Sequence, residues 1–401
     1  MVRTADVAVV GGGVVGLAVA RAVLLRRPGL RVVVLEKEPV LGAHASGRNS
    51  GVLHAGFYYS PDSAKAALTA RGNRLLTEFC AANGVPVRRC GKVVVATSER
   101  DLPGLLELHR RGRSNGVAVE LLDEAALREA EPLARTTGQA LWSPTTGVAD
   151  PGLVLAALAR EVRRLGATVL LGSTVAGGGP GNLDVAGGPL QVGHVINCAG
   201  LYADVVAGWF GFCDDYAMLP FKGMYWQLDW PAGLLRRHVY PVPDCRNPFL
   251  GVHFTATPGG GAKIGPTATP SLRREDYGRL RGRDGREAAA VLRLWPQVLA
   301  SPHHDGWQLV RSEAPKYSRR VLAARARALV PSLQDRHVRV RVRPGVRAQL
   351  WSLYQRRMEM DFVVRGDARS THLLNIVSPG WTASLAVAEQ VVEELCTSGT
   401  L

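Results

Sequence analysis

The first forty residues contain a glycine pattern whose spacing suits chemistry with a dinucleotide. Gly11, Gly13 and Gly16 form G-x-G-x-x-G directly after a short apolar run and before an alanine-rich segment. In such a turn the first glycine permits the tight bend, the second lets a pyrophosphate approach the backbone, and the third lets the helix pack closely on the strand. Val14 and Val15 lie in the turn just before the helix, whose free N–H groups attract phosphate. The pattern therefore predicts a nucleotide site rather than a bare glycine-rich turn.

An acidic residue completes this predicted site. Glu36 ends the second β-branched run, about 20 residues after the glycines, where a carboxylate can accept hydrogen bonds from ribose hydroxyls. A carboxylate at this place also disfavours the 2′-phosphate of NADP. We expect Lys37, the next residue, to belong to the same cofactor-binding set.

Length and composition limit the classes of protein to which the chain can belong. With 401 residues, 46% of them hydrophobic, it is long enough for two intertwined domains. The net charge of +15 comes mostly from dispersed arginines, which we interpret as solvated faces; an anionic membrane surface is the second interpretation, and no nucleic-acid partner is expected. No apolar run is long enough for a transmembrane helix.

The cysteines and the N-terminus bear on the compartment. No C-x-x-C pair occurs, so the spacing indicates neither zinc nor a disulfide framework for Cys80, Cys90, Cys198, Cys213, Cys245 and Cys396. The nucleotide-binding strand begins within a few residues of Met1, so we expect no cleaved targeting peptide. We therefore expect a cytoplasmic protein, with attachment to the inner face of the membrane as the alternative.

Hydrophobic periodicity and turn residues predict the elements that must position the site. Buried strands are expected at 7–10, 31–35, 92–97, 167–171, 192–197, 339–350 and 371–377. Helices are expected at 17–25, 63–82, 101–115, 123–131, 151–165, 200–210, 283–299, 319–330 and 381–395. The glycine-rich stretch 177–188 predicts a hairpin. Alternating, aromatic-rich stretches predict an antiparallel sheet from 221–229, 238–242, 249–255 and 263–265.

The order of these elements predicts two interleaved domains in an α/β fold. Strands that suit a nucleotide domain lie at both ends and in the middle of the chain, with the antiparallel sheet between them. We therefore expect a Rossmann-type nucleotide-binding domain over 1–84, 140–212 and 336–401. The antiparallel sheet then forms a substrate-binding domain over 85–139 and 213–335.

Five further motifs occur in the order of a known family. They are GRNSGVLHAGFYY at 47–59, NCAG at 197–200, PFKG at 220–223, FLGVHF at 249–254 and SPGWTASL at 378–385. Together they resemble the L-2-hydroxyglutarate dehydrogenases and oxidases, a branch of the D-amino-acid-oxidase superfamily of FAD enzymes. Lys222 departs from this branch, because arginine is expected there.

The resemblance implies noncovalent FAD in a GR2 or D-amino-acid-oxidase-like domain. The small residues after the nucleotide fold offer backbone donors near the pyrophosphate and the flavin ring, and the start of the last helix offers N–H groups and its dipole to the pyrimidine edge of the ring. The cofactor contacts expected in addition to the glycine turn are Ser46, Arg48, Asn49, Ser50, Gly51, Val175, Ala199, Gly200, Gly380, Trp381 and Thr382.

Oxidation of a hydroxyl group next to a carboxylate requires a base and a cation. His54 and His253 are the two candidates for the base, because a neutral imidazole accepts a proton readily near pH 7. A cation or hydroxyl groups must fix the substrate carboxylate. The candidates for that clamp are Lys222, Arg347, Tyr58, Tyr59 and Tyr240. No metal cluster is expected.

The resemblance implies oxidation of a 2-hydroxy acid, L-2-hydroxyglutarate to 2-oxoglutarate, by hydride transfer to flavin N5. The alternative within the superfamily is an amine or amino-acid oxidase of specialised metabolism, which needs no strong base. A third hypothesis is a flavoprotein module of a membrane or nucleic-acid complex. The electron acceptor is expected to be oxygen or a quinone.

Overall fold

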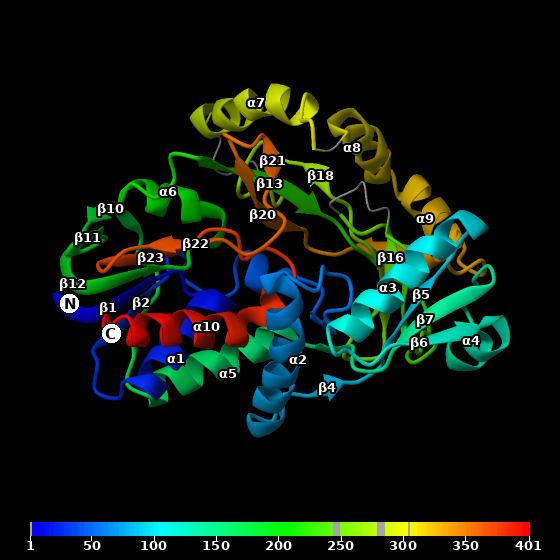
Figure 1. Ribbon diagram of the computed structural model, residues 1–401, viewed down its shortest axis with the longest axis horizontal. Coiled ribbons are helices and arrows are strands. Elements are labelled where there is room, and N and C mark those ends of the chain that lie inside the picture. The colour runs from blue at the N-terminus through cyan, green and yellow to red at the C-terminus, as the bar shows by residue number, and fades with distance from the viewer. Residues whose placement is uncertain (1, 244–248, 279–284, 304) are drawn as a thin grey trace.

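The computed structural model describes residues 2–243, 249–278, 285–303 and 305–401 (Figure 1). Cys245 and the first two residues of the helix expected at 283–299 lie outside the described residues. The other five cysteines are free thiols. Within the described ranges, no helix is both long and apolar enough to span a membrane.

A mostly parallel sheet carries the N-terminal glycine turn. Its order is β10–β11–β12–β1–β2–β9, and β23 joins through β12 and pairs with β22. β1 is parallel to both β2 and β12, so the turn that follows β1 lies at the middle of the carboxyl edge. The strands are β1 (Thr4–Val10), β2 (Val32–Leu35), β9 (Thr168–Leu170), β10 (Val175–Gly179), β11 (Asn182–Val185), β12 (Gly188–Asn197), β22 (Val364–Gly366) and β23 (Ser370–Leu373).

Successive residues of β1 point alternately to the two faces of this sheet, and both faces are buried. Val7 and Val9 pack with the helices below the sheet, whereas Ala8 and Val10 pack into a second core on the other face. Figure 1 shows α1, α5 and α10 beneath the sheet, with α2 beside them. These helices are α1 (Val14–Arg26), α2 (Ala64–Ala82), α5 (Pro151–Arg164) and α10 (Gly380–Thr397), and α6 (Ala203–Gly208) covers the opposite face.

The second sheet runs in the order β19–β14–β17–β16–β15–β5–β7–β6. It is not purely antiparallel as expected, because β5 and β15 pair in parallel. Alternation in the sequence reports burial and not strand direction, so it could not predict this pair. The strands are β5 (Lys92–Val95), β6 (Glu120–Asp123), β7 (Gln139–Ser143), β14 (Trp226–Leu228), β15 (His238–Pro241), β16 (His253–Ala256), β17 (Ala262–Gly265) and β19 (Val338–Arg341). Its faces pack against α3 (Leu102–Ser114), α4 (Glu124–Ala130) and α9 (Arg319–Arg327).

A third sheet, in the order β18–β13–β20–β21, lies under α7 and α8 (Figure 1). The stretch expected at 221–229 therefore divides between two sheets, and the stretch expected at 339–350 does the same. The elements are β13 (Tyr216–Gly223), β18 (Thr269–Pro270), β20 (Gly345–Ser352), β21 (Arg357–Met358), α7 (Gly285–Leu299) and α8 (Gly306–Glu313), the last of which was not predicted. A small sheet is formed by β3 (Val52–Leu53), β8 (Gly147–Ala149) and β4 (Val87–Arg88).

The strand pairing also bears on the proposed division into domains. The expected division places the stretches 140–143 and 338–352 in the nucleotide-binding domain, whereas in the structure they pair with the second and third sheets through β7, β19 and β20. The glycine-rich hairpin is confirmed, because β10 and β11 pair antiparallel across it.

Candidate active site

The glycine turn after β1 has the geometry that its sequence predicts. Gly11 has a φ of +108°, and a Cβ atom there would lie 2.4 Å from the carbonyl oxygen of Cys198. A Cβ atom on Gly16 would lie 1.9 Å from the carbonyl oxygen of Gly11. At Gly13 the nearest atom would be the Oγ of Ser46, at 2.9 Å. The turn therefore brings bare backbone to the space in front of it.

The groups around this turn fit a dinucleotide. The Glu36 carboxylate accepts hydrogen bonds of 2.9 Å from the N–H groups of Gly12 and Glu38, which hold it beside the turn. Ser46 Oγ accepts from the N–H of Val14 at 3.0 Å, so the loop that carries Ser46 is fixed against the start of α1. This position is the one at which phosphate is favoured by the helix dipole.

One cavity extends from the glycine turn to the substrate-side sheets. Its empty space, including the part open to solvent, is about 1240 Å³. Predicted site residues that line it are Gly13, Val14, Val15, Ser46, Arg48, Asn49, Ser50, His54, Gly200, Arg347, Gly380, Trp381 and Thr382. The structure thus brings together residues that are up to 369 positions apart in the sequence, from Gly13 to Thr382.

The loop after η1 (Ala45–Gly47) is held by its own hydrogen bonds. Asn49 Nδ2 donates to the carbonyl of Ser46 at 2.7 Å, and Asn49 Oδ1 accepts from the N–H of Gly51 at 2.8 Å. Gly51 has a φ of +76°, and a Cβ atom there would lie 2.3 Å from the carbonyl oxygen of Ala149. The guanidinium of Arg48 lies 4.0 Å from the ring centre of Tyr277. The loop is therefore a preformed wall of the cavity.

The last helix begins at the cavity, as predicted. α10 starts at Gly380, and the Oγ1 of Thr382 accepts from the N–H of His54 and donates to the carbonyl of Val52, both at 3.1 Å. This threonine ties the start of α10 to β3. The buried indole Nε1 of Trp381 has no hydrogen-bond partner, so a donor is left for a bound group.

The two candidate bases lie in different surroundings. His54 lines the cavity, and burial, followed by the charge of Lys92, holds its pKa well below the usual value. His253 is 3% exposed and does not line the cavity. Its Nδ1 lies 2.9 Å from the carbonyl oxygen of Gly251, so Nδ1 carries the proton and the buried, unpartnered Nε2 is the basic atom. Burial also lowers the pKa of His253. Both imidazoles are therefore neutral at pH 7.

The two candidate cations of the clamp are also separated. Arg347 lines the cavity, and its Nη1 donates a hydrogen bond to the carbonyl of Thr267 at 3.0 Å. The carboxylate whose charge acts on Arg347 is Glu313, which is itself paired with Lys316. Lys222 is buried, pairs with Asp276 at 2.8 Å and is not itself one of the residues that line the cavity. Of these two candidates, Arg347 is thus the one whose charge is available to a ligand in the cavity.

The tyrosines expected to form part of the clamp do not line the cavity. Tyr240 is buried, and its ring stacks on His253 with ring centres 3.7 Å apart. Tyr58 has a buried hydroxyl without a hydrogen-bond partner, and burial raises the pKa of both Tyr58 and Tyr59. The tyrosine that does line the cavity is Tyr225, which was not predicted.

The remaining predicted cofactor residues lie outside the lining. Val175 begins β10, and Ala199 lies next to Gly200 at the start of η3 (Gly200–Tyr202). Lys37 forms ion pairs with Glu38 at 2.6 Å and Glu275 at 2.5 Å.

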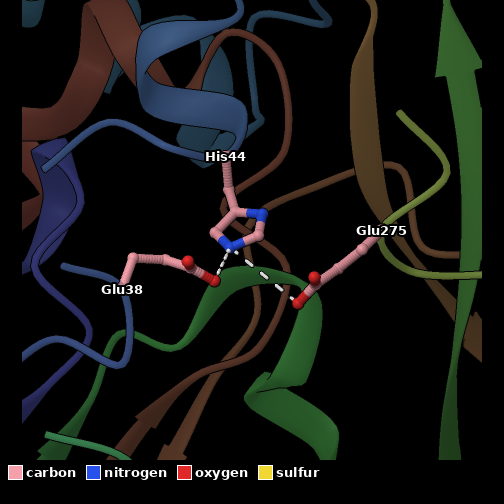
Figure 2. Close-up of side chains that lie close together, drawn as sticks. All are labelled: Glu38, His44 and Glu275. Carbon is pink, nitrogen blue, oxygen red and sulfur yellow. Dashed lines mark hydrogen bonds and ion pairs between the residues drawn. The ribbon is translucent and has the colours of Figure 1, made fainter. Parts of the chain in front are cut away.

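A carboxylate and histidine cluster adjoins Lys37 and links the nucleotide-side loops to the segment after β18. Figure 2 shows the imidazole of His44 between Glu38 and Glu275, with Nε2 2.8 Å and 3.8 Å from their nearest oxygens. This donor set resembles a metal site in composition. However, the Lys37 ammonium contacts both carboxylates and supplies the positive charge there.

Two lysines near the cavity were also missed. Lys263 Nζ donates to the carbonyl of Ser50 at 3.2 Å and lies 5.0 Å from the ring centre of Tyr225, and burial lowers its pKa to about 8. Lys92 is fully buried on β5. Each lies on a short strand as the one charged residue of an apolar run, which is the only signal that the sequence offers.

Comparison with known proteins shows the family. The model of the DAO family, described as FAD dependent oxidoreductase, matches residues 6–394. The mitochondrial L-2-hydroxyglutarate dehydrogenase of Mus musculus is 34% identical, covering 96% of this chain and 87% of that protein. The L-2-hydroxyglutarate dehydrogenase of Indibacter alkaliphilus is 35% identical, covering 97% and 98%.

Solved structures agree on the fold. L-alpha-glycerophosphate oxidase of Mycoplasma pneumoniae with FAD bound has a TM-score of 0.79 and 24% identity, covering 98% of this chain and 95% of that chain. Glycine oxidase of Geobacillus kaustophilus has a TM-score of 0.72 and 21% identity, covering 98% and 94%. These matches confirm the predicted fold class, and the family confirms the predicted cofactor, FAD, which the bare glycine turn and the unpartnered Trp381 donor fit. The chain therefore belongs to the DAO family and is an FAD-dependent oxidoreductase.

Proposed function

We propose that this oxidoreductase oxidises a 2-hydroxy acid, with L-2-hydroxyglutarate as substrate and 2-oxoglutarate as product. The observation that carries the proposal is that His54 and Arg347 line the same cavity as the glycine turn and the start of α10. A base and a free cation are the two protein groups that oxidation of a hydroxyl beside a carboxylate requires. Relatives named L-2-hydroxyglutarate dehydrogenase, at 34–35% identity over nearly the whole chain, support this substrate.

The two residues have separate roles in the proposed reaction. His54, neutral because of its burial, accepts the hydroxyl proton, and Arg347 binds the carboxylate beside the reacting carbon. Bound FAD supplies the hydride acceptor. The N–H groups at the start of α10, together with the helix dipole, stabilise negative charge at that end of the cavity.

Anaerobic reduction of the holoenzyme by L-2-hydroxyglutarate tests the proposal. We expect the flavin absorbance to bleach, and His54→Ala to slow this reduction by at least about 100-fold, the lower end for loss of a general base. His303→Ala is the matched control, because His303 is exposed and does not line the cavity, and it should leave the rate unchanged. Arg347→Met should raise the KM by about 100-fold or more, because a charge-assisted clamp is removed.

The result also separates the proposal from its rivals. A neutral amine needs no strong base for hydride loss, so bleaching by amino acids and not by the hydroxy acid, with His54→Ala near normal, would establish an amine or amino-acid oxidase instead. If His253→Ala is the slow variant and His54→Ala is not, His253 takes the role of the base.

We further propose oxygen or a quinone as the electron acceptor and a cytoplasmic enzyme, free or attached to the inner face of the membrane. Exposed arginines on α9, such as Arg319, Arg320 and Arg325, suit an anionic surface. Reoxidation of the reduced holoenzyme by air or by an added quinone identifies the acceptor, and salt-dependent sedimentation with anionic vesicles tests the attachment.

A further inference from the structure

Lys92 is a buried cation whose surroundings the proposed reaction does not explain. It is 0% exposed, and its Nζ has no hydrogen-bond partner. Aromatic rings enclose the ammonium, with ring centres 4.1 Å away at Tyr240, 5.0 Å at Tyr58 and 5.6 Å at Phe57. A buried charge without a counter-ion is strongly disfavoured, so such a residue is expected only where its charge has a use.

The fold places Lys92 near enough to both candidate bases for its charge to act on each of them. Tyr58 belongs to the segment that follows His54, so one side of the aromatic enclosure is continuous with the loop that lines the cavity. On the other side, the ring of Tyr240 stacks on His253. β5 pairs with β15 so that Lys92 lies opposite His238, on the sheet face that also carries Tyr240 and His253.

We propose that Lys92 is a positioning residue whose positive charge keeps His54 in the neutral form that accepts the substrate proton. That His54 is the base rests on the proposed function, whereas the electrostatic coupling of Lys92 to His54 does not.

Lys92 is the positive charge that acts most strongly on His54. After burial itself, the groups that lower the pKa of His54 are Lys92, His253 and His238, in that order. Burial lowers the pKa of His253 as well, and it lowers the pKa of His238 to about 3, so both imidazoles are neutral at pH 7 and carry no charge themselves.

The tautomer of His238 is fixed by its hydrogen bonds. Its Nδ1 accepts from the N–H of Ala256 at 3.1 Å, so the proton of the neutral ring is on Nε2, 3.2 Å from the Sγ of Cys90. Other titratable groups near these side chains are the phenols of Tyr58, Tyr59, Tyr225 and Tyr240, the thiol of Cys90 and the cavity cation Arg347. The cations Arg88 and Lys263 act on His238, whereas the charges that act on His54 come from Lys92, His253 and His238.

The sign and the pH range follow from the titration of Lys92. Burial lowers the pKa of Lys92 to about 7. Below pH 7 Lys92 is charged, and its repulsion disfavours protonation of His54. This is the pH range in which an ordinary histidine begins to take up a proton. Lys92 therefore extends the activity of His54 as a base to lower pH.

A histidine titration of the FAD-loaded protein tests this inference without substrate. We would label histidine with ¹⁵N, assign His54 by its absence in His54→Gln, and follow its ring nitrogens from pH 4 to pH 9. In Lys92→Met the titration midpoint of His54 should move upward by about 1 pH unit, the size expected for loss of a nearby charge. Lys92→Arg keeps the charge and should keep the midpoint at or below that of the wild type.

Lys65 provides a matched control. It is another buried lysine, 5% exposed on α2, with its ammonium 5.6 Å from the ring centre of Phe362, and it does not line the cavity. Lys65→Met should leave the His54 midpoint unchanged. In the kinetic assay, only Lys92→Met should move the acid limb of flavin reduction toward neutral pH.

The possible outcomes distinguish failure of this inference from failure of the proposed substrate. An unchanged His54 midpoint in Lys92→Met overturns the inference, even if the hydroxy acid proves to be the substrate. A raised midpoint with no reduction by the hydroxy acid supports the coupling and counts against the proposed substrate. Should Lys92→Met not fold, the wild-type His54 signal must show a second inflection near pH 7 as Lys92 loses its proton; a signal without that inflection overturns the inference.

Discussion

Replacing Lys92 with methionine should make the folded protein more stable below pH 7. Burial lowers the pKa of Lys92 from its usual 10.5 to about 7. The difference, 10.5 − 7 = 3.5, corresponds to about 5 kcal/mol of unfavourable free energy in the charged form, at about 1.36 kcal/mol for each unit of pKa. Cation–π attraction to the three enclosing rings offsets about 0.5–2 kcal/mol of this penalty, so we expect Lys92→Met to gain about 3–4.5 kcal/mol of stability.

The stability difference between the wild type and Lys92→Met should depend on pH. Below pH 7 the folded and unfolded chains both hold the proton on Lys92, so the folded wild type bears the whole penalty. Between pH 7 and pH 10.5 the folded chain has released that proton while the unfolded chain has not, so the stability of the wild type rises with pH. The advantage of Lys92→Met should therefore shrink toward pH 10.

Denaturant unfolding at pH 6 and pH 9.5, followed by tryptophan fluorescence, measures both effects. Lys65→Met is again the control; burial lowers the pKa of Lys65 only to about 8, and Asp361 offsets part of that, so its gain should be smaller. The reasoning is refuted if Lys92→Met is less stable than the wild type at pH 6, or if its advantage does not change between the two pH values.

Three further predictions concern the cofactor side of the molecule. Gly11→Ala forces a side chain toward the carbonyl of the neighbouring strand at a φ of +108°, and the purified protein should lose most of its FAD, measured by the ratio of flavin to protein absorbance. Thr382→Val removes the side-chain hydrogen bonds to Val52 in β3 and to His54 just after it, and should lower the free energy of unfolding by about 1–3 kcal/mol, whereas Thr382→Ser should restore most of it. Lys37→Met removes the ammonium that Glu38 and Glu275 share and that lowers the pKa of both, so it should destabilise the protein by roughly 1 kcal/mol at pH 7 and by less at pH 4, where carboxylates begin to protonate. Equal loss of stability at both pH values would show that packing, and not charge, accounts for the last effect.

The cofactor half of the site was predictable because its signals are local. Gly11, Gly13, Gly16 and Glu36 follow one another within a single strand–helix–strand unit, and a steric requirement of the backbone fixes the residue type at each glycine. The start of α10 was predictable for the same reason, since its turn residues lie within a few positions of each other.

The substrate half was less predictable. Residue type alone made Lys222 and Arg347 equally suitable for the carboxylate clamp. They lie on adjacent strands, β13 and β20, but Asp276 neutralises Lys222, whereas no such carboxylate pairs with Arg347 in the described part of the chain. Which cation remains free depends on a partner 54 residues away, and no local pattern encodes it.

The sequence by itself determined the nucleotide-binding unit, the interleaving of two sets of strands and the two histidines that can act as a base. Those features depend on periodicity, turn chemistry and residue type, which act over short stretches of chain. Only the tertiary structure decided that His54 lines the cavity while His253 stacks on Tyr240 outside the lining, and that Lys92 is buried near both histidines without a counter-ion. Burial and charge at these residues come from strands that pair across the fold, including the parallel pair β5–β15, and so the proton affinities of the site arise from long-range packing.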